Sequence, residues 1–415
     1  MIAARRLAVA ALPACALAVA ACGSGGESGV PVINLYNSPQ EHIQAIADRC
    51  NKLAGGRYKI VVNILPRDAD GQREQLVRRL AAADTGLDVL ALDVTWTAEL
   101  AEAGWIREWT GRDAAQARQG TLAKPLDTAI WHGKLYAAPY TTNVQLLWYR
   151  SDLVRRPPAT WRAIMAEAAR LAAEGNPHYG EVTGAQYEGL VVWFNSVVAS
   201  AGGRILTPGG NAVALGPPAL KALQVMRAYA TSQAADPSLS NTHEDEARLA
   251  VEAGSAAFEV NWPYVYAAMA ANQPSMLPHF KWAPYPGIDG PGTSPLGGAN
   301  FAVSAYSPHP EASFQAALCL RDAQSQKTAA TLDGLPPTIE AVYHDPAMAR
   351  PYPMRQAILD ALETAAPRPK TPVYQNVSTV TSAILSPPAA IDPPATLARL
   401  REQIGDALQS KGVLP

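Results

Sequence analysis

The sequence predicts an α/β protein with an open sheet, and three observations lead to this prediction. Short β-rich runs alternate with helical segments over residues 32–103, an order typical of open α/β sheets. Residues 88–92 form a short, mostly apolar run, as expected for a strand buried on both faces of a parallel sheet. The chain also has 415 residues and no internal repeat, which allows two ordinary domains with cores of their own.

The individual elements follow from the local pattern of side chains. The first six, in order, are strand 32–36, helix 41–53, strand 57–65, helix 72–83, strand 88–92 and helix 97–103. β-branched residues support the strands, and Gly104 is the expected end of the last of these helices. The pattern further predicts helices at 161–173, 188–200, 218–231, 245–253, 311–323, 354–364 and 394–409, and strands at 256–260 and 301–305. Segments rich in proline and glycine, at 284–295, 334–337 and 386–394, are expected to be loops.

The N-terminus has the features of an export signal. Arg5 and Arg6 precede an apolar run over residues 7–21 that is too short to span a bilayer. Small residues then lead into Cys22, a pattern that resembles the bacterial lipobox. We expect a signal peptide at 1–21, a diacylated Cys22 that anchors the mature chain to the outer face of the cell membrane, and a flexible tether at 22–30. A short core segment that merely ends in cysteine is the alternative.

Composition and spacing exclude several classes of function. A net charge of −2 without a basic block argues against a nucleic-acid surface. The seven histidines show no metal-binding spacing and there is no Cys-x-x-Cys pair, so no metal site is expected. Residues 68–71 imitate the start of a calcium loop but lack its remaining ligands, and they fit a turn and N-cap better. No phosphate-binding turn is present, and no cofactor is expected for an exported chain.

The cysteine count predicts one disulfide. Of four cysteines, Cys15 would leave with the signal peptide and Cys22 would carry lipid. Cys50 and Cys319 remain, and two leftover cysteines in an exported chain favour a bond between them. Such a bond would join a distant segment to the first helix, whereas two free thiols are the alternative.

Polar residues at strand ends are the first candidates for a binding site. Asn37 follows the first predicted strand and Asp93 follows strand 88–92, and open α/β sheets bind ligands at the carboxyl ends of strands. Helix capping is an equally good role for either residue alone. The chain has 9 tryptophans and 15 tyrosines but only 5 phenylalanines, which suits the holding of sugar rings or simply the filling of a core. A glycosidase would need a carboxylate pair, and the spacing brings no two of Asp93, Glu244, Glu259 and Asp333 together.

Five segments resemble family 1 extracellular solute-binding proteins, the binding components of ABC importers. They occur in the family's order at residues 90–105, 134–149, 254–263, 297–303 and 368–374. The resemblance implies a two-lobed, periplasmic-binding-protein-like α/β fold of type II, like that of maltose-binding protein, with hinge crossovers. The first lobe would comprise residues 31–142 plus 300–334, and the second residues 143–299 plus 335–415. The implied chain is a monomer and not an enzyme.

Within the family the sequence is most similar to mycobacterial trehalose-binding lipoproteins. The similarity lies in residues 141–149, 189–195, 259–263 and 368–374, while residues 37–41 and the short segment between Trp262 and Gly297 depart from the pattern. The ligand-binding residues that the resemblance implies come from both lobes and are Asn37, Asp93, Asn143, Glu244, Trp262, Tyr264, the backbone of Gly298, and Arg368.

The ligand implied by this similarity is a disaccharide, trehalose foremost, which the chain would deliver to ABC permease and ATPase subunits. A maltose-type oligosaccharide or a glycerophosphodiester is the alternative ligand. An extracytoplasmic glycosidase and a structural lipoprotein without a small ligand are the alternative functions.

Overall fold

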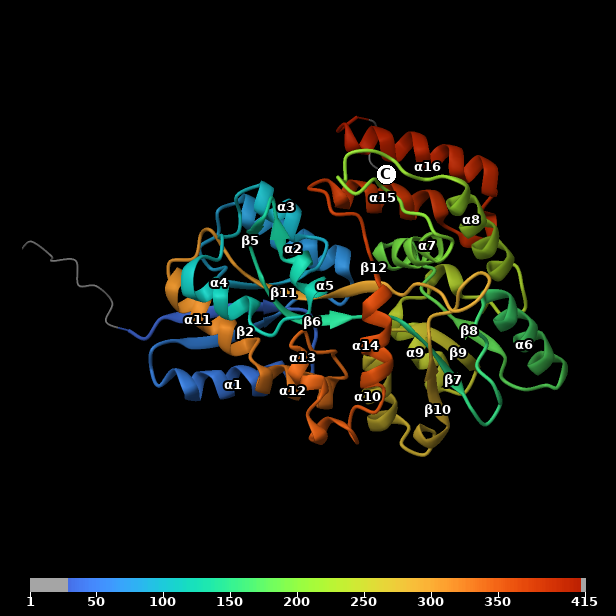
Figure 1. Cartoon of the computed structure of the whole chain (residues 1–415), viewed down its shortest axis with the longest axis horizontal. Helices are drawn as coiled ribbons and strands as arrows, with labels where there is room; N and C mark the ends of the chain where they lie inside the picture. Colours follow the sequence, from blue (N-terminus) through green and yellow to red (C-terminus); the bar gives the residue numbers. More distant parts are fainter. Residues whose placement is uncertain (1–28, 412–415) are drawn as a thin grey trace, which may run out of the picture. The chain divides into compact units, whose positions relative to one another are not determined.

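Two sheets organise the chain, which is described here by a computed structural model over residues 29–411 (Figure 1). The predicted signal peptide, Cys22 and most of the predicted tether lie outside the described residues. Contacts group Pro31–Pro415 into one compact unit, so the exact boundaries between two lobes stay a prediction. Below, the first lobe means the first sheet with its helices, and the second lobe means the second sheet with its helices.

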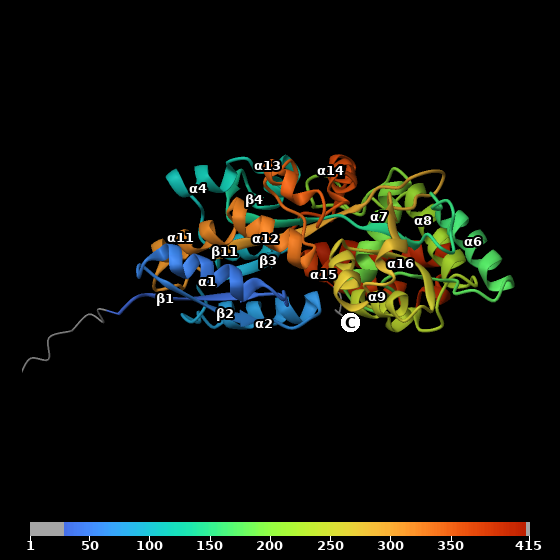
Figure 2. The same cartoon turned by 90° about the horizontal axis from the view of Figure 1, so that it is seen from below.

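The first sheet is open and mostly parallel at its centre, as predicted. Its order is β12-β11-β3-β1-β2, and β6 also pairs with β11. β1 runs parallel to β2 and β3, whereas β11 is antiparallel to β3. Figure 2 shows β2 at the outer edge of this sheet, close to α2. The strands are β1 (Val32–Asn37), β2 (Lys59–Ile64), β3 (Val89–Asp93), β6 (Ala138–Asn143), β11 (Pro295–Val303) and β12 (Ala366–Pro367).

The helices of the first lobe join consecutive strands or follow β11. Asp68 caps α2, because its carboxylate accepts the Gly71 N–H at 2.7 Å; the predicted cap is therefore correct, although the helix starts three residues before position 72. A disulfide between Cys50 and Cys319 joins α1 to α11 across 269 positions of sequence. These helices are α1 (Ile43–Ala54), α2 (Ala69–Ala81), α3 (Thr97–Glu102), α4 (Gly111–Arg118), α5 (Ala123–Thr128), α11 (Pro310–Leu320) and α12 (Ala323–Asp333), beside the small hairpin of β4 (Ile130–Trp131) and β5 (Lys134–Leu135).

The second sheet is mainly antiparallel. Its order is β10-β7-β9-β8, with only β8 parallel to its neighbour. Its strands are β7 (Leu146–Arg150), β8 (Tyr179–Glu181), β9 (Ala256–Asn261) and β10 (Phe280–Ala283). Its helices are α6 (Trp161–Ala173), α7 (Glu188–Ser200), α8 (Pro217–Ala230), α9 (Glu244–Glu252), α10 (Tyr264–Asn272), α15 (Tyr374–Leu385) and α16 (Pro393–Leu408).

Helices from the end of the chain complete the second lobe. Figure 1 shows α15 and α16 beside α7 and α8, and the same helices contact one another in the coordinates. α15 was not predicted, because its Ser, Thr and Val residues favour a helix only weakly. Its apolar side chains, including Val377 and Leu385, are buried in the core of this lobe, so tertiary packing decides its conformation. Helices α4, α5, α10 and α12 were also missed.

Three apolar clusters form the interior. One fills the first lobe, and a second fills the second lobe around Trp161, Trp193 and Tyr229. The third joins Trp148 and Phe280 of the second sheet to Ala330 of α12. It also includes residues of the connecting helices α13 (Glu340–Tyr343) and α14 (Arg355–Thr364). This third cluster therefore contributes apolar packing where the chain crosses between the two sheets.

Candidate functional site

The ends of three strands of the first sheet meet where the chain crosses to the second sheet. β6 ends at Asn143 and β7 of the other sheet begins at Leu146. Asn143 lies opposite Gly297 of β11, and Asp93, at the end of β3, lies opposite Ala299. The crossing therefore brings two predicted ligand residues to one edge of the sheet, the edge at which open α/β sheets bind ligands.

Gly298 is a position where the fold requires glycine. Its φ of +128° is rarely adopted by residues with a side chain, and a Cβ there would lie 2.3 Å from the carbonyl oxygen of Thr141. A Cβ on the preceding Gly297 would lie 2.9 Å from the indole of Trp262. Both glycines thus permit a close approach, one to the backbone of β6 and the other to the Trp262 ring.

Arg368 joins the first lobe to the second through two carboxylates. Its Nη2 donates to Asp93 Oδ1 at 2.9 Å and Oδ2 at 3.1 Å, and its Nη1 donates to Glu188 Oε1 at 2.6 Å. The Arg368 side chain is only 3% exposed. Burial lowers the pKa of its guanidinium, but the charges of Asp93 and Glu188 outweigh this effect and raise it. Arg368 is therefore a permanent cation at this position.

Asp93 has a second set of partners on its own lobe. Its Oδ1 accepts the Thr95 N–H at 2.9 Å and the Thr95 hydroxyl at 2.8 Å. The residue thus stabilises the turn after β3 and also faces Arg368; it does not cap α3, whose N-cap position is Trp96. Its side chain remains 23% exposed, so one face of the carboxylate is still accessible.

Glu244 and Tyr264 lie together at the N-terminal ends of α9 and α10. The hydroxyl of Tyr187 donates to Glu244 Oε2 at 2.5 Å, and the hydroxyl of Tyr264 donates to Asp245 Oδ1 at 3.2 Å. Burial and the neighbouring acidic groups raise the pKa of both tyrosines well above the usual range. Both therefore stay protonated at neutral pH and act as hydrogen-bond donors.

Trp262 is held at the end of β9. Its backbone N–H donates to Asn261 Oδ1 at 2.8 Å, and the Asn261 amide donates in turn to the Glu244 carbonyl and to Glu259 Oε2, both at 2.9 Å. Asn261 thereby fixes the position of Trp262 relative to α9. The Trp262 side chain is only partly buried, so an apolar ring face can serve as a contact surface.

The two asparagines differ in what they offer. Asn37 is 2% exposed, and its amide donates to the Ser38 carbonyl at 2.7 Å, so its donor is already used. Asn143 has a buried Oδ1 without a hydrogen-bond partner among residues 29–411. A buried acceptor without a partner is costly, and a ligand hydroxyl could satisfy it.

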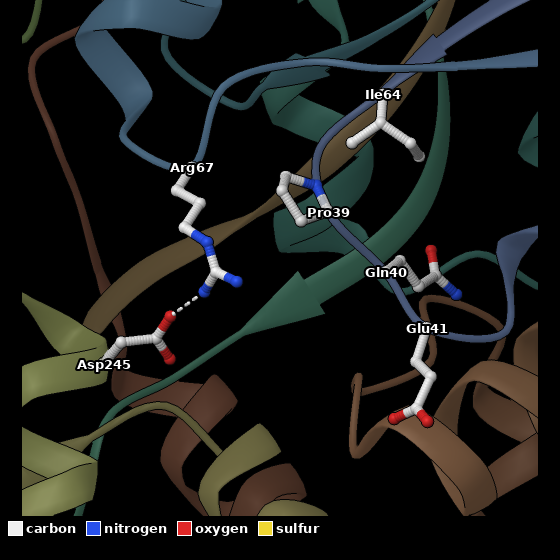
Figure 3. Close-up of a pocket in the computed structure, with 6 residues that line it drawn as sticks. All are labelled: Pro39, Gln40, Glu41, Ile64, Arg67 and Asp245. Atoms are coloured by element: carbon white, nitrogen blue, oxygen red, sulfur yellow. Dashed lines mark hydrogen bonds and ion pairs between the residues drawn. The ribbon is translucent and has the colours of Figure 1, made fainter.

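A cavity of about 370 Å³ lies between the loops after β1 and β2 and the start of α9 (Figure 3). An ion pair of 2.7 Å from Arg67 Nη1 to Asp245 Oδ2 crosses it, as Figure 3 shows. Gln40 is fixed beside it by donating to the Tyr140 hydroxyl at 2.9 Å and to Asp333 Oδ2 at 2.8 Å. The lining residues are Pro39, Gln40, Glu41, Ile64, Arg67 and Asp245.

The structure thus groups the predicted residues in two sets. Asp93 and Arg368 are in direct contact, and Asn143 and Trp262 both lie against Gly297, the neighbour of Gly298 in β11. Glu244 and Tyr264 belong with the α9–α10 ends, and Asn37 lies below the loop that lines the cavity. Their roles as ligand contacts stay predictions.

Sequence reasoning missed Glu188, Tyr187 and the Arg67–Asp245 pair. No local pattern marks them, because each acquires its role from a partner more than 50 positions away. A buried helix that begins with an acidic residue, as in Glu188–Ser200, is the one signal that could have drawn attention to Glu188.

Comparison with known proteins establishes the family. Residues 36–327 match the family described as bacterial extracellular solute-binding protein. A relative from Deinococcus radiodurans, named as a probable ABC transporter-binding protein, is 30% identical over 357 residues, which cover 82% of this chain and 83% of the relative. The chain belongs to the bacterial extracellular solute-binding proteins.

Solved structures agree with this family and with the two-lobed, maltose-binding-protein-like fold of type II. Maltose-bound MalE3 of T. maritima matches with a TM-score of 0.82 and 26% identity, covering 90% of this solute-binding protein and 98% of that chain. The GacH receptor of Streptomyces glaucescens, described in complex with acarbose, matches with a TM-score of 0.82 and 20% identity, covering 92% and 99%. The second likeness shows the fold alone.

Among residues 29–411 of the solute-binding protein, no helix combines the length and apolar character that a membrane span requires. Within the same range, no group of three or more His, Cys, Asp or Glu side chains is arranged to hold a metal ion.

Proposed function

We propose that this chain is the lipid-anchored substrate-binding component of an ABC sugar importer, and that it holds a disaccharide between its lobes. Trehalose is the favoured ligand, because the sequence resembles LpqY, the mycobacterial trehalose-binding lipoprotein. The bound chain would deliver the sugar to permease and ATPase subunits. The proposed lobes are residues 31–142 plus 300–334 and residues 143–299 plus 335–415.

The observation that carries the proposal is the contact of Asp93 with Arg368 beside the Asn143 acceptor. Asp93 ends β3 of the first sheet, whereas Arg368 is held by Glu188 of the second lobe. The Asp93 carboxylate and the Asn143 amide oxygen offer acceptors for the hydroxyls of a sugar, and the N–H groups of Arg368 that Glu188 and Asp93 leave unbound offer donors. The ring of Trp262 supplies an apolar surface for the C–H face of the ring.

Ligand contacts on both lobes would favour closure of the lobes. Asp93 and Glu244 belong to different lobes, so one ligand can bond to both only when the lobes meet. A ligand that gains contacts in the closed form shifts the equilibrium toward that form. Micromolar affinity corresponds to about −8 kcal/mol, and charge-assisted hydrogen bonds of about 1.5–3 kcal/mol each make a few such bonds sufficient.

Isothermal titration calorimetry with a panel of disaccharides tests the proposal. We expect heat of binding with trehalose, and Asp93→Ala should weaken that binding roughly 10- to 100-fold, because it removes about one charge-assisted hydrogen bond. Asp84→Ala is the matched control, since Asp84 is an ion-paired aspartate at the end of α2. Unchanged affinity in Asp93→Ala would remove this residue from the site.

A maltose-type oligosaccharide is the second candidate ligand. MalE3, with its bound maltose, is 26% identical to this chain over nearly its whole length. Maltose and trehalose differ in their glycosidic linkage, so the same calorimetric panel separates the two ligands. Release of glucose from either sugar would instead indicate a glycosidase.

The lipid anchor is a separate part of the proposal, because Cys22 lies outside the described residues. Cells that express the full chain with labelled fatty acid should yield a labelled protein in the membrane fraction. Cys22→Ala should abolish both the label and the membrane association. An unlabelled wild-type chain would contradict the anchor without affecting the sugar site.

A further inference from the structure

Glu188 is a buried carboxylate that the proposed ligand contacts do not include. It is the first residue of α7, and its side chain is 7% exposed. Oε1 accepts from Arg368 Nη1 and from the Tyr374 hydroxyl, each at 2.6 Å, and Oε2 accepts from the Ser378 hydroxyl. Burial raises the pKa of its carboxyl, while the charge of Arg368 and the two hydroxyls oppose that shift. The N-terminus of a helix also stabilises a carboxylate at this position.

Glu188 and Asp93 together bind both terminal nitrogens of the Arg368 guanidinium. Nη1 is bound to Glu188 and Nη2 to both oxygens of Asp93. Only Nε has no hydrogen-bond partner among residues 29–411. Arginine binds phosphate strongly when two N–H groups point at it in parallel, and this arrangement leaves no such pair.

Two further cations of the chain are also paired with carboxylates. Arg67 pairs with Asp245 at the cavity, and Lys370 lies 3.2 Å from Asp127. Glu244, in contrast, accepts a hydrogen bond from the uncharged hydroxyl of Tyr187. Among these residues the carboxylates Asp93, Glu188, Glu244 and Asp245 outnumber the cations Arg67 and Arg368, so an anionic ligand that contacts them would meet excess negative charge.

We infer that Glu188 is a specificity-determining residue, which makes the cleft accept uncharged saccharides and reject those that carry phosphate or sulfate. It acts as a positioning residue by holding Nη1 of Arg368, so that the guanidinium cannot turn both of its terminal nitrogens toward an anion. Its own negative charge also repels an anion, because like charges brought together in a desolvated site cost several kcal/mol. This inference rests on the proposed function, since it concerns the same cleft.

Calorimetry on matched ligands tests the inference. The ligands are trehalose, trehalose 6-phosphate and the uncharged 6-O-acetyl ester, with maltose and maltose 6′-phosphate as a second pair. For the wild-type chain we expect the phosphate to bind at least ~100-fold more weakly than the parent sugar, and the acetyl ester within about tenfold of it. The acetyl ester controls for size, so the difference between the two esters reports charge.

Glu188→Gln should lower the ratio of the dissociation constants of the phosphate ester and the parent sugar by about tenfold, because it removes the charge and weakens the hydrogen bond to Arg368. Glu181→Gln is the matched control, since Glu181 is another buried glutamate of the second lobe and has no contact with Arg368; its ratio should equal that of the wild type. A purely structural role for Glu188 would weaken all ligands by one factor and leave the ratio unchanged, which would overturn the inference.

The wild-type ratio can overturn the inference even if Glu188→Gln does not fold. Equal binding of a sugar and its phosphate would overturn the inference and leave the proposed sugar-binding function intact. Binding of neither uncharged disaccharide would overturn the proposed function and the inference with it. Strong rejection of the phosphate, with tolerance of the acetyl ester, would support both.

Discussion

The two lobes bury a sheet under helices by different means. In the first lobe, β1, β2 and β3 follow one another in sequence with helices between them, the core is apolar, and the Cys50–Cys319 disulfide joins α1 to α11. In the second lobe, strands from distant parts of the chain pair mainly antiparallel, and α15 and α16 complete the core from the C-terminal region.

The second lobe also buries acidic groups in its interior. Glu181, Glu188 and Glu259 are all buried, and Glu181 lies opposite Glu259 in the pairing of β8 with β9. Of the three, only Glu188 has a cationic partner among the described residues. The first lobe also buries Asp88 and Arg321, but neutral groups bind both of them, whereas the second lobe buries Glu188 in an ion pair with Arg368.

Removal of the Arg368 side chain should have the largest effect on the free energy of unfolding, because it leaves the buried Glu188 carboxylate without a cationic partner. We expect Arg368→Ala to lower the free energy of unfolding by about 3–5 kcal/mol, measured by urea denaturation. Lys370→Ala is the control, since its pair with Asp127 is exposed and should contribute less than about 1 kcal/mol. Equal effects of the two substitutions would contradict the dependence of the second lobe on matched charge.

Removal of the disulfide tests the first lobe. The double substitution Cys50→Ser and Cys319→Ser should lower the free energy of unfolding by about 2–5 kcal/mol, because the bond restricts the unfolded chain over a long loop. Hydrogen exchange should increase first in α1 and α11 and not in the second lobe. Titration of the denatured, unreduced mature chain should find no free thiol at these positions, and two free thiols would contradict the bond.

A buried glutamate should make the second lobe sensitive to pH. Burial, followed by the charges of Asp236 and Glu259, raises the pKa of Glu181 from 4.5 to about 8. Because the folded form holds this proton more tightly than the unfolded form, the stabilisation is complete below pH 4.5 and is lost as the pH rises to about 8. Glu181→Gln should therefore raise stability at pH 8 by roughly 1–3 kcal/mol relative to the wild type, and change it little at pH 4.5.

Thermal unfolding of both chains at the two pH values measures this difference. Glu340→Gln, at an exposed position of α13, is the control and should leave the pH dependence as it is in the wild type. If Glu181→Gln instead lowered stability equally at both pH values, the Glu181 carboxyl group would be required for packing. That result would contradict the view that burial of its charge destabilises the folded form.

Removal of the Arg67–Asp245 ion pair at the cavity should have the smallest effect on the free energy of unfolding. Arg67 is 82% exposed where it pairs with Asp245, and exposed pairs contribute less than about 1 kcal/mol. Arg67→Ala should change the unfolding free energy by no more than this, as urea denaturation can show. A loss of several kcal/mol would mean that the exposed pair, and not the buried Arg368, couples the lobes.

Features that depend on neighbours along the chain could be predicted from the sequence. The alternation over residues 32–103 predicted the first lobe, because each of its parallel strands is followed by the helix that covers it. The Asp68 cap and the ends of β1 and β3 were equally local. Family membership followed from segments spread along the whole chain, so it did not require the fold.

Which charges meet and which helices complete the second lobe depend on contacts between distant parts of the chain. Glu188 and Arg368 are separated by 180 positions, and no periodic pattern records a contact at that distance. α15 forms because burial against α7 and α16 outweighs the weak helix preference of its residues. Burial and long-range pairing depend on the whole fold, and for that reason they appear only when the chain is seen in three dimensions.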